Sequence, residues 1–92
     1  MAIIQVSSAA SREVYEAVER IVDLSGDRPE GMIVHAAAEQ ANGTVVIVDL
    51  WESGTAMDAF EQGRLFPAFA SMPGAPTPEA PSRQYAFHVV RA

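Results

Sequence analysis

Residues 45–52 constrain the fold most strongly, because they form an apolar strand that Asp49 alone interrupts. The apolar members are Val45, Val46, Ile47, Val48, Leu50 and Trp51. A strand without a polar face is buried on both faces. The rest of the chain offers two amphipathic helices, enough to cover one face of a sheet. We therefore expect a second copy of the chain to cover the other face, which predicts a homodimer through sheet faces.

Composition predicts one small domain over residues 1–92, whose core is marginal alone and gains stability from association. The absence of cysteine excludes disulfides, thiolate metal ligands and a cysteine nucleophile. A formal charge of -6 and the lack of lysine argue against a nucleic-acid partner. No apolar run reaches the roughly 18 residues of a membrane span, and no basic flank marks a signal peptide. We expect a cytoplasmic protein without a membrane partner.

The first half of the chain predicts a strand, a helix and a hairpin. Residues 2–6 are expected to form a strand. A helix with apolar residues on one side follows over residues 12–24, with Ser11 as its N-cap. Residues 32–40 form the next strand, which an Asn-Gly pair at residues 42–43 joins to the apolar strand through a tight two-residue turn.

The second half predicts a helix, a loop and a final strand. The helix starts at residues 52–55, and Gly63 and Pro67 are expected to bend or divide it, because an internal proline removes a hydrogen bond. Residues 72–82 are rich in proline and read as a surface loop, the one place where a lid could sit. Residues 84–91 close the chain as the fourth strand.

This order of elements predicts an α+β ferredoxin-like βαββαβ fold, with a four-stranded antiparallel sheet and both helices on one face. A two-residue turn would place His35 opposite Leu50, and Val34 opposite Trp51. One face would then carry Ile33, His35, Ala37, Val46, Val48 and Leu50, and the other Met32, Val34, Ala36, Ala38, Ile47, Asp49 and Trp51. A one-residue bulge would swap part of this assignment.

Four passages carry a resemblance to a known family. They are residues 29–37 (PEGMIVHAA), 48–53 (VDLWES), 56–69 (AMDAFEQGRLFPAF) and 85–90 (YAFHVV). They resemble the dimeric α/β-barrel superfamily, in particular the small bacterial proteins grouped with antibiotic-biosynthesis monooxygenases. The resemblance implies that two ferredoxin-like protomers dimerise into an α/β barrel with the helices outside. It also implies a cavity in each protomer between the sheet and the second helix.

The same resemblance implies several chemistries, since the fold hosts more than one. The quinone-forming monooxygenases use dioxygen without metal or flavin, and have an Asn four residues before the pocket Trp and a Tyr in the next helix. In this sequence Ile47 stands four residues before Trp51, where those enzymes have Asn, and the next helix has no tyrosine. Haem-degrading relatives use a histidine on the second helix, which residues 54–72 lack. Polyketide cyclases use His and Tyr, and those residue types occur here as His35, His88, Tyr15 and Tyr85.

His35 and Asp49 are the candidate catalytic residues. His35 lies mid-strand among apolar neighbours, where a neutral imidazole can act as a general base. The alternative is a hydrogen-bonded core or interface histidine. Asp49 could orient a histidine or a substrate hydroxyl, since an unpaired buried carboxylate is costly. It could equally pair with an arginine such as Arg91 for structure alone.

A substrate site is predicted around Trp51, whose flat ring could stack an aromatic substrate or simply fill the core. The other predicted substrate-binding residues are Met57, Phe60, Phe66, Val34, Ile47 and His88. At helical spacing the Met and Phe residues are more often core. Arg64 could hold an anion at the cavity mouth or remain solvated. No spacing of ligands predicts a metal site, and no cofactor is expected.

Three hypotheses remain open. The chain could be a cofactor-independent enzyme that oxygenates or cyclises a small aromatic or polyketide-like molecule. It could be a module that binds a hydrophobic ligand without turning it over. It could also be a structural homodimer whose apparent pocket its own Met57 and Phe60 fill.

Overall fold

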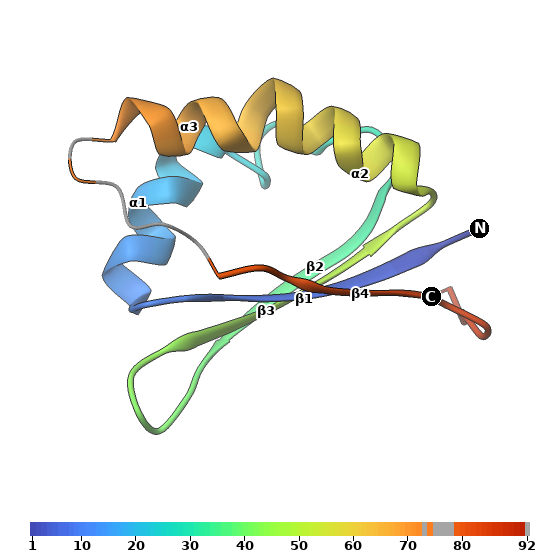
Figure 1. The fold of residues 1–92 in the computed structure, drawn as a ribbon, viewed down its shortest axis with the longest axis horizontal. Coiled ribbons are helices and arrows are strands. Elements are labelled where there is room, and N and C mark those ends of the chain that lie inside the picture. Colours follow the sequence, from blue (N-terminus) through green and yellow to red (C-terminus); the bar gives the residue numbers. More distant parts are fainter. Residues whose placement is uncertain (73, 75–78, 92) are drawn as a thin grey trace.

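A computed structural model describes residues 1–72, 74 and 79–91. The sheet has four strands in the order β2-β3-β1-β4, and each neighbouring pair is antiparallel. The helices lie together on one face of this sheet (Figure 1). The elements are β1 (Ile3–Ala9), α1 (Arg12–Val22), β2 (Met32–Glu39), β3 (Val45–Trp51), α2 (Gly54–Phe60), η1 (Glu61–Leu65), α3 (Phe66–Ser71) and β4 (Ser82–Tyr85). The predicted ferredoxin-like α+β fold is confirmed.

The turn between β2 and β3 has three residues, and the predicted two-residue turn is wrong. The backbone N–H of Gly43 donates to the Gln40 carbonyl at 2.9 Å, and that of Gln40 donates to Thr44 at 2.8 Å. Residues 41–43 therefore form the loop, and Gly43 takes a φ of +88°. A tight turn followed by a glycine with positive φ is the usual three-residue hairpin. The added residue moves the register by one, so that His35 lies opposite Asp49 and not Leu50.

The register corrects the predicted faces of the sheet. Because side chains alternate along a strand, a shift of one residue exchanges the two faces of β2 relative to β3. His35 and Asp49 consequently share the face that the helices cover, while Val34 and Val48 lie on the other face and are exposed. An irregularity between Met32 and Val34 returns Met32 to the covered side, opposite Trp51.

Helix α1 begins and ends at residues that cap it. The hydroxyl of Ser11 accepts a hydrogen bond from the Val14 N–H at 3.2 Å, which confirms the predicted N-cap. At the other end Asp23 adopts a left-handed conformation with a φ of 54°, and its N–H donates to the Glu19 carbonyl. The helix therefore stops at Val22, two residues before the predicted end.

The second helical segment changes its winding where glycine and proline were expected to bend or divide it. Ser53 caps α2 by accepting a hydrogen bond from the Ala56 N–H at 3.1 Å. The wider π-helical turn η1 then separates α2 from α3, and Pro67 lies in the first turn of α3. A π turn inserts one residue into a helix and often marks a functional site.

Trp51 is the centre of the core, with only 1% of its surface exposed. Its ring packs on Phe60, with ring centroids 5.3 Å apart, at the corner where β3 meets the helices. The other buried residues of the cluster around Trp51 are Ile3, Val22, Met32, Met57 and Ala68. The covered face of the sheet and the inner sides of the helices thus meet in one apolar cluster.

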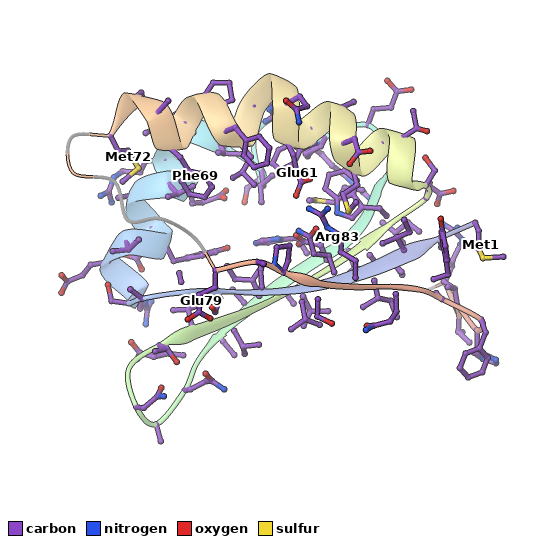
Figure 2. All side chains as sticks on the ribbon, in the orientation of Figure 1. Met1, Glu61, Phe69, Met72, Glu79 and Arg83 are labelled. Carbon is purple, nitrogen blue, oxygen red and sulfur yellow. The ribbon has the colours of Figure 1, made fainter. Side chains whose placement is uncertain are left out.

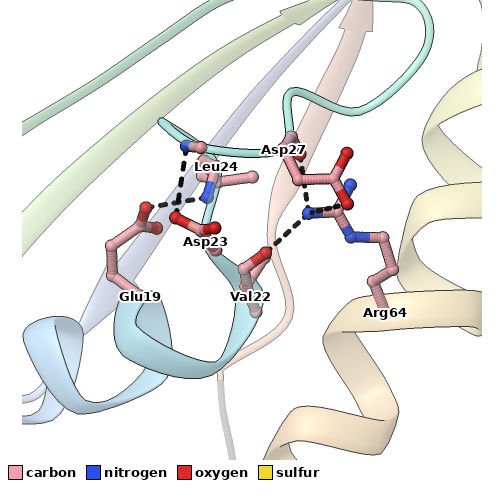
Figure 3. Close-up of polar contacts among 7 residues, drawn as sticks. Glu19, Val22, Asp23, Leu24, Asp27 and Arg64 are labelled. Atoms are coloured by element: carbon pink, nitrogen blue, oxygen red, sulfur yellow. Dashed lines mark hydrogen bonds and ion pairs between the residues drawn. The ribbon is translucent and has the colours of Figure 1, made fainter.

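Arg64 ties the end of α1 to the second helical segment (Figure 3). Its Nη2 donates to the carbonyls of Val22 at 2.6 Å and Asp27 at 2.7 Å. The guanidinium also lies 5.5 Å from the centre of the Phe60 ring. Cations favour the carbonyl end of a helix, so Arg64 stabilises the packing of the helices.

Strand β4 is shorter than the predicted strand over residues 84–91, and its start is two residues earlier. Its partner β1 begins at Ile3, which pairs with Tyr85. One further backbone bond joins Ala86 to Ala2, and the described pairing between the two strands ends there. Phe87 is fully exposed, at 102% of its reference surface. Strand β1 conversely extends to Ala9, beyond the predicted range of 2–6.

Two further expectations concern other parts of the chain. The proposed lid over residues 72–82 includes residues 73 and 75–78, which lie outside the described residues. Within the described residues, no helix is long and apolar enough to cross a membrane.

Candidate active site

A cavity of about 710 Å³ lies between the covered face of the sheet and the helices. Helix α1 closes one side of it, while the second helical segment supplies Phe60, Leu65, Phe66 and Phe69. Figure 2 shows Phe69 pointing from α3 toward the sheet. Most of the wall is apolar, a composition typical of sites for small organic molecules.

A row of polar side chains crosses the sheet beneath this cavity. His35 on β2 pairs with Asp49 on β3, Asp49 with Gln5 on β1, and Gln5 with Arg83 on β4. Each strand therefore contributes one polar residue at the same level, and all four line the cavity. The adjacent level holds Met32, Trp51 and Ile3, which are buried and apolar. Gln5 and Asp49 are buried and need hydrogen-bond partners, which His35 and the more exposed Arg83 provide in two separate groups.

The first group is a hydrogen-bonded chain of Tyr15, His35 and Asp49. The Nδ1 of His35 lies 2.5 Å from Oδ1 of Asp49, and its Nε2 lies 2.6 Å from the hydroxyl of Tyr15. The Tyr15 and His35 rings are nearly parallel, with an angle of 10° and centroids 6.0 Å apart. With Nδ1–H donating to the carboxylate, Nε2 is left as the basic nitrogen that can take a proton.

The surroundings shift the pKa of two members of this chain. The pKa of His35 is raised above its ordinary 6.5, chiefly by its hydrogen bond to Asp49, against an opposing effect of burial. The charges of Asp49 and Glu19 raise it further. Burial raises the pKa of Tyr15 above its ordinary 10.0, and the charges of Glu19 and Asp49 add to the rise. The arrangement suits a histidine that accepts a proton near neutral pH beside a tyrosine that keeps its own.

The second group joins Gln5, Arg83 and Glu61. The Nε of Arg83 donates to Oε1 of Gln5 at 2.6 Å, and its Nη2 lies 2.8 Å from both carboxylate oxygens of Glu61. Figure 2 shows Arg83 rising from the sheet toward Glu61 on the helical layer. Only 7% of the Glu61 side chain is exposed, and this carboxylate lies in the π turn η1. The group connects β1, β4 and the second helical segment.

The structure distributes the predicted site residues over three places. His35, Asp49, Ile47, Phe60 and Phe66 line the cavity. Trp51 and Met57 lie in the core behind Phe60 and do not line it. Val34 and His88 lie outside it, because Val34 is on the uncovered face and His88 follows the end of β4. Arg91 pairs with Glu52, so it does not serve Asp49.

Four members of the two polar groups were not among the predicted site residues: Tyr15, Gln5, Glu61 and Arg83. Tyr15 was counted among the apolar positions of its helix and named only as one of the His and Tyr residue types that polyketide cyclases use, although its hydroxyl is the partner of His35. A sequence signal existed for Glu61, which lies four residues from both Met57 and Leu65 in a helical segment, whereas Gln5 has one apolar and one polar neighbour at strand spacing, Ile3 and Ser7. Their partner in β4 is far away in sequence, and only the sheet order brings it near.

The fold and the site together define a small α+β protein with a hydrogen-bonded tyrosine, histidine and aspartate on the wall of a mostly apolar cavity. No protein-family model and no curated protein matches the chain. Solved structures do match it in fold. A protein from Chloroflexus aurantiacus, provisionally named an antibiotic biosynthesis monooxygenase, shares 12% identity over 98% of this chain and 97% of its own, with a TM-score of 0.69.

Two other structures with this fold have different chemistries. SnoaB, a cofactor-independent oxygenase from Streptomyces nogalater, shares 17% identity over 97% of this chain and 96% of its own, with a TM-score of 0.68. MhuD, a heme-degrader from Mycobacterium tuberculosis, shares 16% identity over 98% and 99%, with a TM-score of 0.59. At such identities the likeness shows the fold alone. The predicted resemblance is therefore confirmed for the fold. The activity depends on the residues of the site, because one fold hosts many functions.

Proposed function

We propose that the chain is an enzyme that performs acid–base chemistry on a small aromatic or polyketide-like molecule, leading to oxygenation or to ring closure. The observation that carries the proposal is the Tyr15–His35–Asp49 chain on the wall of an apolar cavity. An imidazole oriented by a carboxylate is a strong arrangement for a general base, because the carboxylate stabilises the imidazolium that forms.

The geometry supports the following sequence of proton movements. The substrate lies against Phe60 and Phe66, with an acidic O–H or C–H at the Tyr15 and His35 end of the cavity. Nε2 of His35 takes that proton, either directly or through the Tyr15 hydroxyl, and Asp49 holds the charged ring in place. The anion left on an aromatic substrate is electron-rich. It can react with dioxygen or attack a carbonyl within the same molecule, so the proposal needs no metal ion and no flavin.

We also propose that the chain acts as a homodimer that covers the bare face of the sheet, on the opposite side from the cavity. On this face Val6, Val34 and Val48 are 36 to 51% exposed in the single chain. Contiguous exposed apolar surface of this kind marks an association site. The dimer would explain why β3 is apolar on both faces.

The test is turnover of anthrones and polycyclic phenols in air, followed by quinone absorbance and oxygen uptake. We expect His35→Ala to lower the rate by about 100-fold or more, as for loss of a general base. His88→Ala is the matched control, since this histidine is exposed and outside the cavity. Tyr15→Phe, with the exposed Tyr85→Phe as its control, tests the hydroxyl without changing the packing.

Binding is read separately from Trp51 fluorescence, because the Trp51 ring packs on Phe60 and Phe60 lines the cavity. Saturable quenching without turnover would favour a binding module. An equal rate in wild type and His35→Ala would exclude the proposed role of His35. Neither quenching nor turnover across the panel would favour a structural homodimer.

A further inference from the structure

A second hollow, of about 450 Å³, adjoins the cavity at the outer edge of the sheet, where β2 is the last strand. We call it the outer hollow. The start of α1 supplies Arg12, Tyr15 and Glu16 to its wall, and β2 supplies residues 35–39. Of the described residues, Tyr15 and His35 are the two that line both spaces. The Tyr15–His35 pair therefore separates the cavity from the outer hollow.

The two spaces differ in their surroundings. The cavity wall is mostly apolar and lies under the helices. The rim of the outer hollow carries the charged residues Arg12, Glu16 and Glu39, which are all exposed. Nε of Arg12 donates to Oε1 of Glu16 at 2.8 Å, so this ion pair is on the surface of the molecule. The outer hollow is thus a polar space that water can enter.

The small side chain of Ala37 keeps this space open beside His35. His35, Ala37 and Glu39 alternate along β2 and so share the face that the helices cover. Ala37 is exposed and lines the outer hollow, but it does not line the cavity. A larger residue at this position would fill the outer hollow and leave the residues of the cavity wall unchanged.

The hydrogen bonds of His35 limit how its proton can move. Nδ1 is engaged with Asp49, and Nε2 with the hydroxyl of Tyr15. Once Nε2 holds a proton from a substrate, this proton either returns to the bound molecule or passes to water. A substrate in the cavity displaces water from the cavity side of the pair. The Tyr15 hydroxyl can accept one proton while it donates another, so it can connect Nε2 to water on the other side.

We propose that the outer hollow is the port through which His35 exchanges protons with water while a substrate occupies the cavity. In this step the Nε2–H bond breaks, the Tyr15 oxygen accepts that proton, and the Tyr15 O–H proton passes to water in the hollow. The electron pair of the substrate anion stays on the substrate, and no co-reactant is needed. The proposal rests on the proposed function of His35 as a base, and it adds how that base is restored.

Access to His35 is measured with diethyl pyrocarbonate, a small reagent that acylates the neutral imidazole, and mass spectrometry locates the modified residue. The variant Ala37→Leu fills the outer hollow. We expect it to slow the modification of His35 by about 10-fold, because a closely packed side chain leaves no room for the reagent. His88 is the internal reference, since it is exposed and lines neither space. Ala59→Leu, on the exposed side of α2, is the matched control variant.

Turnover tests whether protons use the same port. Ala37→Leu should lower kcat by about 5-fold and leave kcat/KM within about 2-fold, because the substrate gives up its proton before the base is restored. The solvent deuterium isotope effect on kcat should increase, since proton exchange then limits the rate. Ala59→Leu should change neither quantity. Circular dichroism verifies that both variants are folded.

Two results would overturn the proposal. Equal rates of His35 modification in wild type and folded Ala37→Leu would mean that the reagent enters through the cavity. Slower modification with an unchanged kcat would mean that the hollow gives access to His35 but does not carry its protons during turnover. The proposed function fails separately. If His35→Ala leaves turnover unchanged while Ala37→Leu slows modification, the acid–base proposal is wrong and the opening to His35 stands.

Discussion

The two faces of the sheet use the same four strands and have opposite chemistry. The face under the helices carries the polar row of His35, Asp49, Gln5 and Arg83. The face without a cover carries exposed valines on β1, β2 and β3, with Val6 paired to Val48 and Val34 paired to Leu50. Polar groups thus occur where burial makes them costly, and apolar groups occur where water would reach them. These two observations are the basis of the two proposals, a reaction on the covered face and association through the bare face.

The largest effect should distinguish the neighbours Trp51 and Leu50, which point to opposite faces. Trp51→Ala removes the most buried side chain and should lower the free energy of unfolding by about 3–5 kcal/mol. Leu50→Ala, on the bare face, should cost less when the protein is dilute. Urea denaturation followed by circular dichroism at low concentration measures both. Equal losses would mean that the two faces contribute alike to the fold of one chain.

A charge at the centre of the bare face should abolish association. Val48→Asp would place an unpaired carboxylate in the proposed dimer interface, which we expect to weaken the dimer by about 100-fold or more. Sedimentation velocity over a concentration series gives the dissociation constant. Ala59→Asp, on the exposed side of α2, is the control for the added charge. A dimer that persists in Val48→Asp would place the interface elsewhere.

A substitution at Gly43 in the hairpin turn should lower the free energy of unfolding by a smaller amount. Gly43→Ala forces a side chain into a backbone with a φ of +88°, at a cost of about 1 kcal/mol in the free energy of unfolding. Gly63→Ala is the matched control, because no atom lies within 4 Å of the added carbon and alanine favours helix. Thermal denaturation of both variants checks this, and an unchanged Gly43→Ala protein would contradict the strain.

Replacing Asp49, the partner of His35, should change the pKa of His35 more than the free energy of unfolding. Asp49→Asn takes away the main cause of the raised pKa of His35, so this pKa should fall toward its ordinary 6.5. In wild type the raised pKa stabilises the fold fully at pH values below about 6.5, and this contribution is lost as the pH rises through the raised pKa. NMR titration of the imidazole carbon-bound protons, with His88 as the internal reference, follows the shift. An unaltered titration would contradict the role of Asp49.

Local patterns predicted most of the fold, because each element depends on nearby residues. The apolar spacing of α1, the cap at Ser11 and the apolar run of β3 all act within a few positions. The end of β4 was missed because it depends on where its partner β1 starts. The segment after Tyr85 has the composition of a strand, but β1 begins at Ile3, which pairs with Tyr85, and only the bond between Ala86 and Ala2 continues the pairing.

The candidate site was predicted less completely than the fold. His35 and Asp49 were recognised as chemically suitable, yet the predicted register separated them, since an Asn-Gly pair fits both a two-residue and a three-residue loop. Tyr15 and Arg83 reach the site only through tertiary packing, from a helix and from the last strand. Sequence spacing carries no information about such contacts.

The length of the loop between β2 and β3 decides which β2 side chains share a face with Asp49. With three residues in the loop, the histidine of one strand and the aspartate of the other meet under the helices. Shortening the loop by one residue would send them to opposite faces without altering a single strand residue. A chain of this fold could therefore gain or lose its acid–base pair by one codon inserted or deleted at the hairpin tip. Comparisons of such chains should weigh a gap at this turn as heavily as a substitution at His35.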